Sequence, residues 1–164
     1  MHKRLTHFCL CLLLATAASA QQVREWKMPD LESRLAGAGD TLLIVNFWAT
    51  WCRPCVEEIP HFEAINQKYA AQGVKVLFVS LDFPSQKKTV SKFIASRNMQ
   101  AETVLLAETD YDAWMPKISP DWGGAIPATL IVRPAKGVRD FAGKSFTYAE
   151  LETWVLELLQ EAGK

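Results

Sequence analysis

The order of apolar segments between residues 42 and 107 constrains the fold more than any other feature of the sequence. Apolar runs at 42–48 and 74–81, and a shorter one at 103–107, are typical of strands, the first two covered on both faces. The segments between them begin at residues 53 and 85 and repeat apolar side chains at helical spacing. A strand–helix–strand–helix–strand order predicts parallel strands joined by right-handed crossovers, and hence an α/β domain.

The second half of the chain predicts a strand at 128–132 and a half-exposed hairpin partner at 138–142. Thr147 and Glu150 fit a capping box at the start of a last amphipathic helix. Near the other end, 26–38 indicates a short helix. A polar stretch that contains 111–114 is followed by 122–127, which is expected to be a loop that enters the strand at 128. We expect one domain, about residues 21–164.

Composition excludes several classes of protein. The chain has 164 residues, 49% hydrophobic and 22% charged, which describes an ordinary globular domain rather than a disordered or fibrous one. Its 18 Lys and Arg balance 18 Asp and Glu. Because it has neither a net positive charge nor a long basic run, nucleic acid is not an expected partner.

The first twenty residues have the pattern of an export signal. A basic start precedes an apolar stretch at 5–15 that is too short to span a bilayer, and small residues follow at 18–20. We predict that residues 1–20 are a cleaved signal peptide and that the mature protein is periplasmic; an uncleaved signal that tethers the chain is the alternative. The mature chain keeps two of four cysteines and one histidine, His61. Disulfides form in such a compartment.

Cys52 and Cys55 lie where the first long strand ends and a helix begins. Unpaired N–H groups at a helix N-terminus favour negative charge, so the pKa of Cys52 should fall below the usual value of about 8.5. Arg53 adds a positive charge nearby. The two-residue spacing puts Cys55 one helical turn later, within reach to resolve a mixed disulfide.

Other roles for a CxxC motif fit less well. A structural zinc ion needs two further ligands and the mature chain offers only His61, so no metal and no other cofactor is expected. Haem attachment would need a histidine where Val56 stands. An inert structural disulfide is disfavoured for two reasons. The loop that it would close is too small for the bond to stabilise the folded protein much, and the strand-to-helix junction should expose both sulfurs.

The sequence around the cysteines resembles the thioredoxin superfamily, and specifically the exported TlpA/ResA-like thiol-disulfide oxidoreductases. The resemblance rests on the segment from Val45 to Pro60, which contains Phe47-Trp-Ala-Thr-Trp-Cys-Arg-Pro-Cys55, and on Ile126-Pro127-Ala-Thr129. The order of the predicted strands and helices matches the family over essentially the whole mature chain. It implies a thioredoxin-like fold, a central mixed sheet with helices on both faces. It also implies a cis-proline at Pro127 beside the cysteines.

By this resemblance, Trp51, Arg53, Pro54, Ile126 and Pro127 are the expected substrate-binding residues and Cys52 and Cys55 the catalytic ones. The sequence departs from cytoplasmic thioredoxins in one respect. Asn46 stands where they have a buried aspartate that assists proton transfer, and an amide cannot take up that proton.

ResA-like members have an active-site glutamate three residues after the second cysteine. Glu58 stands there and is the expected replacement base. The alternative is that Glu57 and Glu58 are both solvated acids of the first helical turn.

The resemblance predicts a disulfide reductase that acts on protein substrates and receives electrons from a membrane donor. We expect this reductase to be periplasmic, because of the signal pattern, and to be a monomer. Apocytochrome c, copper-centre cysteines and general periplasmic disulfides remain open as substrates. Three other functions have their own requirements. A copper chaperone similar to Sco proteins would need a CxxxC motif and a distant histidine. A thiol peroxidase would not need Cys55. A binding module would use Trp26, Trp114 and Trp122 as its surface.

Overall fold

The computed structural model describes residues 23–161, with the side chain of residue 161 left out, so the predicted signal peptide lies outside the described residues. In this part of the chain the strands are β1 (Arg24–Trp26), β2 (Leu42–Trp48), β3 (Val74–Ser80), β4 (Glu102–Leu106), β5 (Ala128–Arg133) and β6 (Val138–Ala142). The α-helices are α1 (Met28–Ala36), α2 (Arg53–Lys68), α3 (Lys87–Ser96), α4 (Tyr111–Ile118) and α5 (Tyr148–Glu161). Short 3-10 turns lie at Ala70–Gln72, Pro84–Gln86 and Pro134–Lys136.

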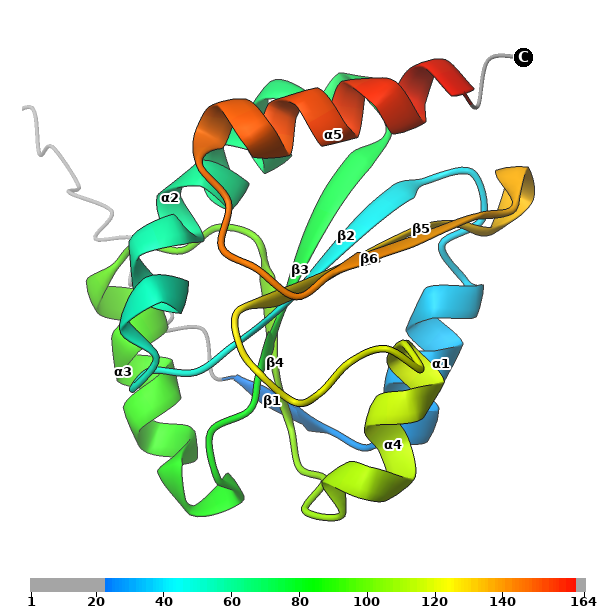
Figure 1. Ribbon diagram of the computed structural model, residues 1–164. Coiled ribbons are helices and arrows are strands. Elements are labelled where there is room, and N and C mark those ends of the chain that lie inside the picture. Colours follow the sequence, from blue (N-terminus) through cyan, green and yellow to red (C-terminus); the bar gives the residue numbers. More distant parts are fainter. Residues whose placement is uncertain (1–22, 162–164) are drawn as a thin grey trace, which may run out of the picture.

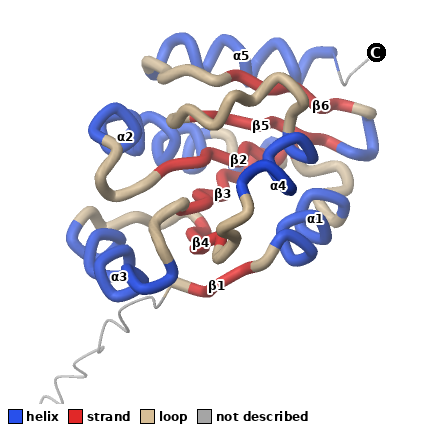
Figure 2. The backbone as a smooth tube through the Cα atoms, turned by 60° about the horizontal axis from the view of Figure 1, so that its bottom comes forward, coloured by secondary structure: helices blue, strands red, loops and turns tan. Residues whose placement is uncertain are grey.

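The strands form one mixed sheet in the order β1-β4-β3-β2-β5-β6 (Figure 2). β4, β3 and β2 are parallel neighbours, as the crossover argument predicts, and β1 is parallel to β4. β5 is antiparallel to β2, and β6 pairs with β5 as the expected hairpin. The predicted α/β class and mixed sheet are therefore confirmed.

Helices cover both faces of this sheet (Figure 1). α2, α3 and α5 pack on one face and α1 and α4 on the other, each with its own apolar cluster. Side chains of β2 alternate between the two clusters, so Ile44 and Trp48 face α2 while Val45 and Phe47 face the opposite side. The same alternation turns Asn46 toward α2.

Two elements differ from the sequence prediction. β1 was not predicted; it has three residues, two of them exposed, and it forms only by pairing with β4. Residues 111–118, for which no helix was predicted, form α4. Asp110 caps this helix by accepting a hydrogen bond from the backbone N–H of Ala113, and its buried side chains are Trp114 and Ile118.

No helix within residues 23–161 combines the length and the apolar character that crossing a membrane requires.

Candidate active site

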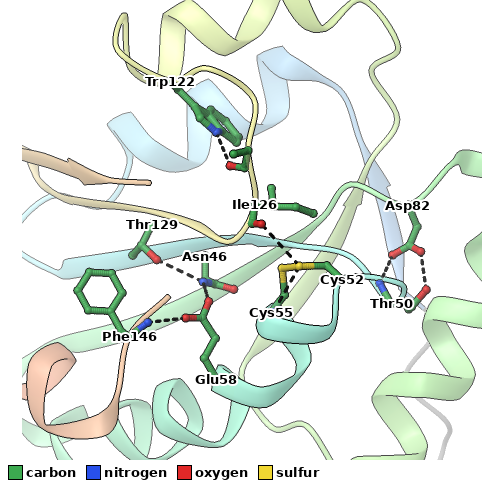
Figure 3. The surroundings of a disulfide bond; sticks show 11 residues. Asn46, Thr50, Cys52, Cys55, Glu58, Asp82, Trp122, Ile126, Thr129 and Phe146 are labelled. Atoms are coloured by element: carbon green, nitrogen blue, oxygen red, sulfur yellow. Dashed lines mark hydrogen bonds between the residues drawn. A yellow bond between two sulfur atoms is a disulfide. The ribbon is translucent and has the colours of Figure 1, made fainter. Parts of the chain in front are cut away.

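Cys52 and Cys55 form a disulfide at the N-terminus of α2, with an S–S distance of 2.03 Å (Figure 3). Cys52 is the N-cap residue, and its Sγ accepts a hydrogen bond from the backbone N–H of Cys55 over 3.3 Å. The first sulfur therefore lies where the helix presents unpaired N–H groups, as the sequence predicts. These N–H groups would stabilise negative charge on Cys52 once the disulfide is reduced.

Both sulfurs are more buried than the strand-to-helix junction led us to expect. Cys52 is 5% exposed and Cys55 is completely buried. The expectation was wrong because a distant segment covers the junction: the carbonyl oxygen of Ile126 lies 3.8 Å from Cys52 Sγ (Figure 3). Only Cys52 keeps any accessible surface, so attack from outside can reach this residue and not Cys55.

Sheet pairing brings Pro127 to the disulfide. β5 begins at Ala128, which pairs with Phe47 near the end of β2, so the residues before β5 lie beside the start of α2. The Ile126–Pro127 peptide bond is cis, as the family resemblance implies. Trp122 holds the preceding loop in place, because its Nε1–H donates to the carbonyl of Ala125 over 2.8 Å and its ring lies 4.7 Å from that of Phe47.

Trp51, Arg53 and Pro54, the expected binding residues next to Cys52, have different environments. Trp51 is 63% exposed and stands next to Cys52. Pro54 lies in the first turn of α2, where its missing N–H leaves no hydrogen bond unmade. The guanidinium of Arg53 donates to Glu57 over 2.8 Å, and this pairing raises the pKa of Arg53 above its usual value. The positive charge expected to act on Cys52 is thus shared with Glu57.

Glu58 is a buried carboxylate, 2% exposed, on the face of α2 that meets the sheet. Its Oε1 accepts from Asn46 Nδ2 and its Oε2 from the backbone N–H of Phe146, each over 2.8 Å (Figure 3). Burial raises the pKa of Glu58 from 4.5 to about 6, against the lowering effect of both hydrogen bonds. The alternative of two solvated acids is wrong for Glu58, whereas Glu57 is exposed.

Asn46 lies on β2 and faces Glu58 (Figure 3). In the pairing of β2 with β5 it stands opposite Thr129, whose hydroxyl oxygen accepts a second hydrogen bond from Asn46 Nδ2 over 3.2 Å. The sequence analysis identified Asn46 and Glu58 but gave no role to Thr129 or Phe146. Phe146 takes part through its backbone, for which the sequence carries no signal, whereas Thr129 could have been found as a polar residue in an apolar strand.

Asp82 is a further site residue that the sequence analysis missed. It is buried directly after β3, and its carboxylate accepts from Thr50 N–H over 2.9 Å, Thr50 Oγ1 over 2.5 Å and Ser80 Oγ over 2.7 Å. Thr50 belongs to the loop that carries Trp51 and Cys52, so Asp82 fixes this loop to the neighbouring strand (Figure 3). An acidic residue at the end of an apolar strand was the available signal.

Two of the three tryptophans of the alternative binding surface lie in the core. Trp114 and Trp122 are buried in the apolar cluster that also contains Phe47, so they do not form the exposed aromatic surface that a binding module would need. Within residues 23–161, no three His, Cys, Asp or Glu side chains are grouped as metal ligands.

Comparison with known proteins gives the family. The model of the AhpC/TSA family matches residues 18–141, more than half of the chain, so the protein belongs to this family. It is 27% identical over 134 residues to the thiol-disulfide oxidoreductase ResA of Oceanobacillus iheyensis, a match that covers 77% of this chain and 60% of that protein. It is 39% identical over 62 residues to ResA of Geobacillus kaustophilus, covering 38% and 34%. The chain thus spans less than two thirds of the length of these relatives.

Solved structures confirm the thioredoxin-like fold. A thiol:disulfide interchange protein of the thioredoxin family from Chlorobium tepidum aligns with a TM-score of 0.63 and 22% identity, over 76% of this chain and 83% of that one. StoA from Bacillus subtilis aligns with a TM-score of 0.56 and 22% identity, over 71% and 84%.

Proposed function

We propose that this protein is a thiol-disulfide oxidoreductase that reduces disulfide bonds of exported proteins. One observation carries the proposal: the Cys52–Cys55 disulfide lies at the start of α2, beside the cis Ile126–Pro127 bond, with only Cys52 accessible. This arrangement gives one sulfur for attack and a second sulfur, protected from solvent, for resolution. The similarity to proteins named thiol-disulfide oxidoreductase ResA supports the same chemistry.

The reaction starts from the reduced protein. The Cys52 thiolate attacks one sulfur of a substrate disulfide, forming a mixed disulfide and releasing the other substrate sulfur as a thiolate. The Cys55 thiolate then attacks Cys52 Sγ, which releases the second substrate thiolate and leaves the Cys52–Cys55 disulfide. Two electrons pass from the protein dithiol to the substrate, and the oxidised form described above is the product state.

Glu58 is the group we propose to accept the proton of Cys55. The two residues are three positions apart on α2, which puts their side chains on the same face of the helix. With a pKa raised to about 6, Glu58 is mostly ionised at neutral pH and binds a proton more readily than a solvated carboxylate. Asn46 supplies a hydrogen bond to Glu58 but has no proton-accepting role in this scheme.

Regeneration needs a reductant, and we propose a membrane-bound protein dithiol that reduces the Cys52–Cys55 disulfide by the reverse exchange. The reaction would take place in the periplasm, the location that the signal pattern of residues 1–20 predicts. Apocytochrome c disulfides are among the substrates we propose, together with other periplasmic disulfides. The redox-active cysteines are the only redox group that this mechanism requires.

Trapping tests the mechanism. The Cys55→Ser variant should accumulate covalent adducts with substrate proteins through Cys52, and a reductant should release them. The matched Cys52→Ser variant, which keeps the buried sulfur, should give none. Absence of adducts with Cys55→Ser, or equal amounts with both variants, would contradict the assignment of roles.

Direction is tested in the cell. Alkylation of freshly isolated protein should find Cys52 and Cys55 mostly reduced if a donor supplies electrons, and mostly oxidised if the protein acts as an oxidant. Loss of the reduced form when membranes lack dithiol donors would support the reductase. Rapid peroxide consumption or tight Cu(I) binding by the reduced protein, without exchange activity, would instead favour a rival function.

A further inference from the structure

Large apolar side chains are exposed at four positions in residues 23–161, and two of them flank the redox site. Trp51 is 63% exposed and Phe83 is 59% exposed. Trp51 precedes Cys52, and Phe83 follows Asp82, the residue that fixes the Cys52 loop. The other two, Tyr111 and Leu156, lie on α4 and α5.

The backbone holds the two flanking residues at the same edge of the sheet. Strands β2 and β3 are parallel and end in register, with Trp48 paired to Ser80. Pairing continues past the strands, because Leu81 N–H donates to the carbonyl of Trp48 over 2.8 Å. Asp82 then joins the loops through its two hydrogen bonds from Thr50 (Figure 3). The segments 49–51 and 81–83 therefore form one connected unit next to the disulfide.

Phe83 is fixed in this unit. Its backbone N–H donates to Gln86 Oε1 over 3.2 Å, and Pro84 follows it at the start of a 3-10 turn. Its side chain is nevertheless left in solvent. Since transferring a Phe side chain out of water is favourable, two exposed large aromatic residues on one fixed edge indicate a binding surface.

The charges beside this edge favour an uncharged partner. Arg53 and Glu57 neutralise each other at the start of α2, and the carboxylate of Asp82 is buried and satisfied by three donors. On the other side of Cys52, Ile126 is partly exposed. Three loops near Cys52 thus each carry an apolar residue that is at least partly exposed: Trp51, Phe83 and Ile126.

We propose that Trp51 and Phe83 form a substrate-binding surface that selects protein segments in which the reacting cysteine has large apolar neighbours. This inference rests on the proposed function, because the occupant is the substrate of the same exchange. The occupant is an extended segment of another protein, and the same segment contacts both Cys52 and this surface. Phe83 is the specificity-determining residue, since it lies outside the CxxC motif and its removal leaves both sulfurs in place.

The test compares two peptides of equal length and charge, each with one cysteine in a mixed disulfide with 2-mercaptoethanol. Phe and Leu flank the cysteine in one peptide, and Ser and Thr in the other. The reduced protein becomes oxidised as it releases the peptide thiol and 2-mercaptoethanol, so the single-turnover rate constant is measured directly. The wild type should react about tenfold faster with the apolar peptide.

In Phe83→Ser this preference should fall to about twofold, because the rate with the apolar peptide should fall more than the rate with bis(2-hydroxyethyl) disulfide, which has no flanking side chains. Phe83→Leu should retain most of the preference. Leu156→Ser, which removes an exposed apolar side chain from α5, is the matched control and should behave as wild type. Thermal unfolding verifies that each variant folds.

Equal rates for the two peptides in the wild type, or an unchanged preference in Phe83→Ser, would overturn the proposal while exchange itself continues. Failure of the wild type to react even with the small disulfide would instead overturn the proposed function. A dimer in sedimentation experiments that Phe83→Ser dissociates would assign the surface to a second copy and would also overturn the inference.

Discussion

Asn46 and Glu58 form a buried hydrogen bond, from Nδ2 to Oε1 over 2.8 Å, between the central strand β2 and the helix α2. In this pair the strand residue is a neutral donor, and the ionisable carboxyl comes from the helix. The hydrogen bond favours the ionised form of Glu58, while burial favours the protonated form and prevails, so the pKa rises to about 6.

The Glu58→Gln variant should have a different dependence of stability on pH. Because the pKa of Glu58 is raised from 4.5 to about 6 on folding, the folded state binds its proton more tightly than the unfolded state does. This group's contribution is fully present below pH 4.5 and is lost as the pH rises through 6, a change of about 2 kcal/mol. Urea unfolding across this pH range should show the change in the wild type and not in Glu58→Gln.

Glu57→Gln is the control for this measurement, because Glu57 is exposed on the same helical turn. It should retain the wild-type dependence of the free energy of unfolding on pH. A wild-type protein that lost no stability between these pH values relative to Glu58→Gln would contradict the raised pKa.

The Asn46→Asp variant should be strongly sensitive to pH. It places a second carboxyl within hydrogen-bond distance of Glu58. Because two adjacent negative charges repel, ionising both carboxyls is unfavourable, and the pKa of the pair rises. We expect the variant to lose roughly 1–3 kcal/mol more stability than the wild type between mildly acidic and mildly alkaline pH. Asn66→Asp, which keeps the acceptor for Val76 N–H, should not. Parallel pH profiles for all three proteins would contradict the prediction.

Arg53 and Glu57 allow a test of how charge acts on Cys52. Glu57→Ala should lower the pKa of Cys52, because it frees the Arg53 guanidinium and removes a negative charge. Arg53→Ala should raise it slightly, and the double variant should return close to the wild type. Ultraviolet absorbance of the thiolate in the reduced protein measures each value. Added salt should shrink the differences, since the pair is exposed.

Asp82→Ala should destabilise the protein by about 1–3 kcal/mol, because it leaves the Thr50 N–H and two hydroxyl groups without their buried acceptor. Asp82→Asn keeps one acceptor oxygen and should lose less. Guanidinium unfolding of the oxidised proteins measures the loss, with exposed Asp121→Ala as the control. Equal stability of Asp82→Ala and Asp121→Ala would show that Asp82 does not hold the loop.

Local patterns predicted the elements that depend on neighbouring residues. The capping box at the last helix is confirmed, since Thr147 N–H donates to Glu150 Oε2 over 2.9 Å and Glu150 N–H donates to Thr147 Oγ1 over 3.3 Å. β1 escaped prediction because its short, mostly exposed strand is stabilised only by pairing with β4. α4 was not predicted, because Pro116 lies inside it and polar residues surround it, although Asp110 is a typical N-cap residue.

The sequence by itself determined that two cysteines one helical turn apart follow a buried strand, because strand, cap and helix are all local and arise from residues 42–68. Tertiary structure alone decided which sulfur is accessible and which carboxylate is buried. Ile126 covers Cys52 from 74 residues away, and Phe146 binds Glu58 from 88 residues away. Contacts over such separations depend on sheet order and register, which no local pattern of side chains specifies.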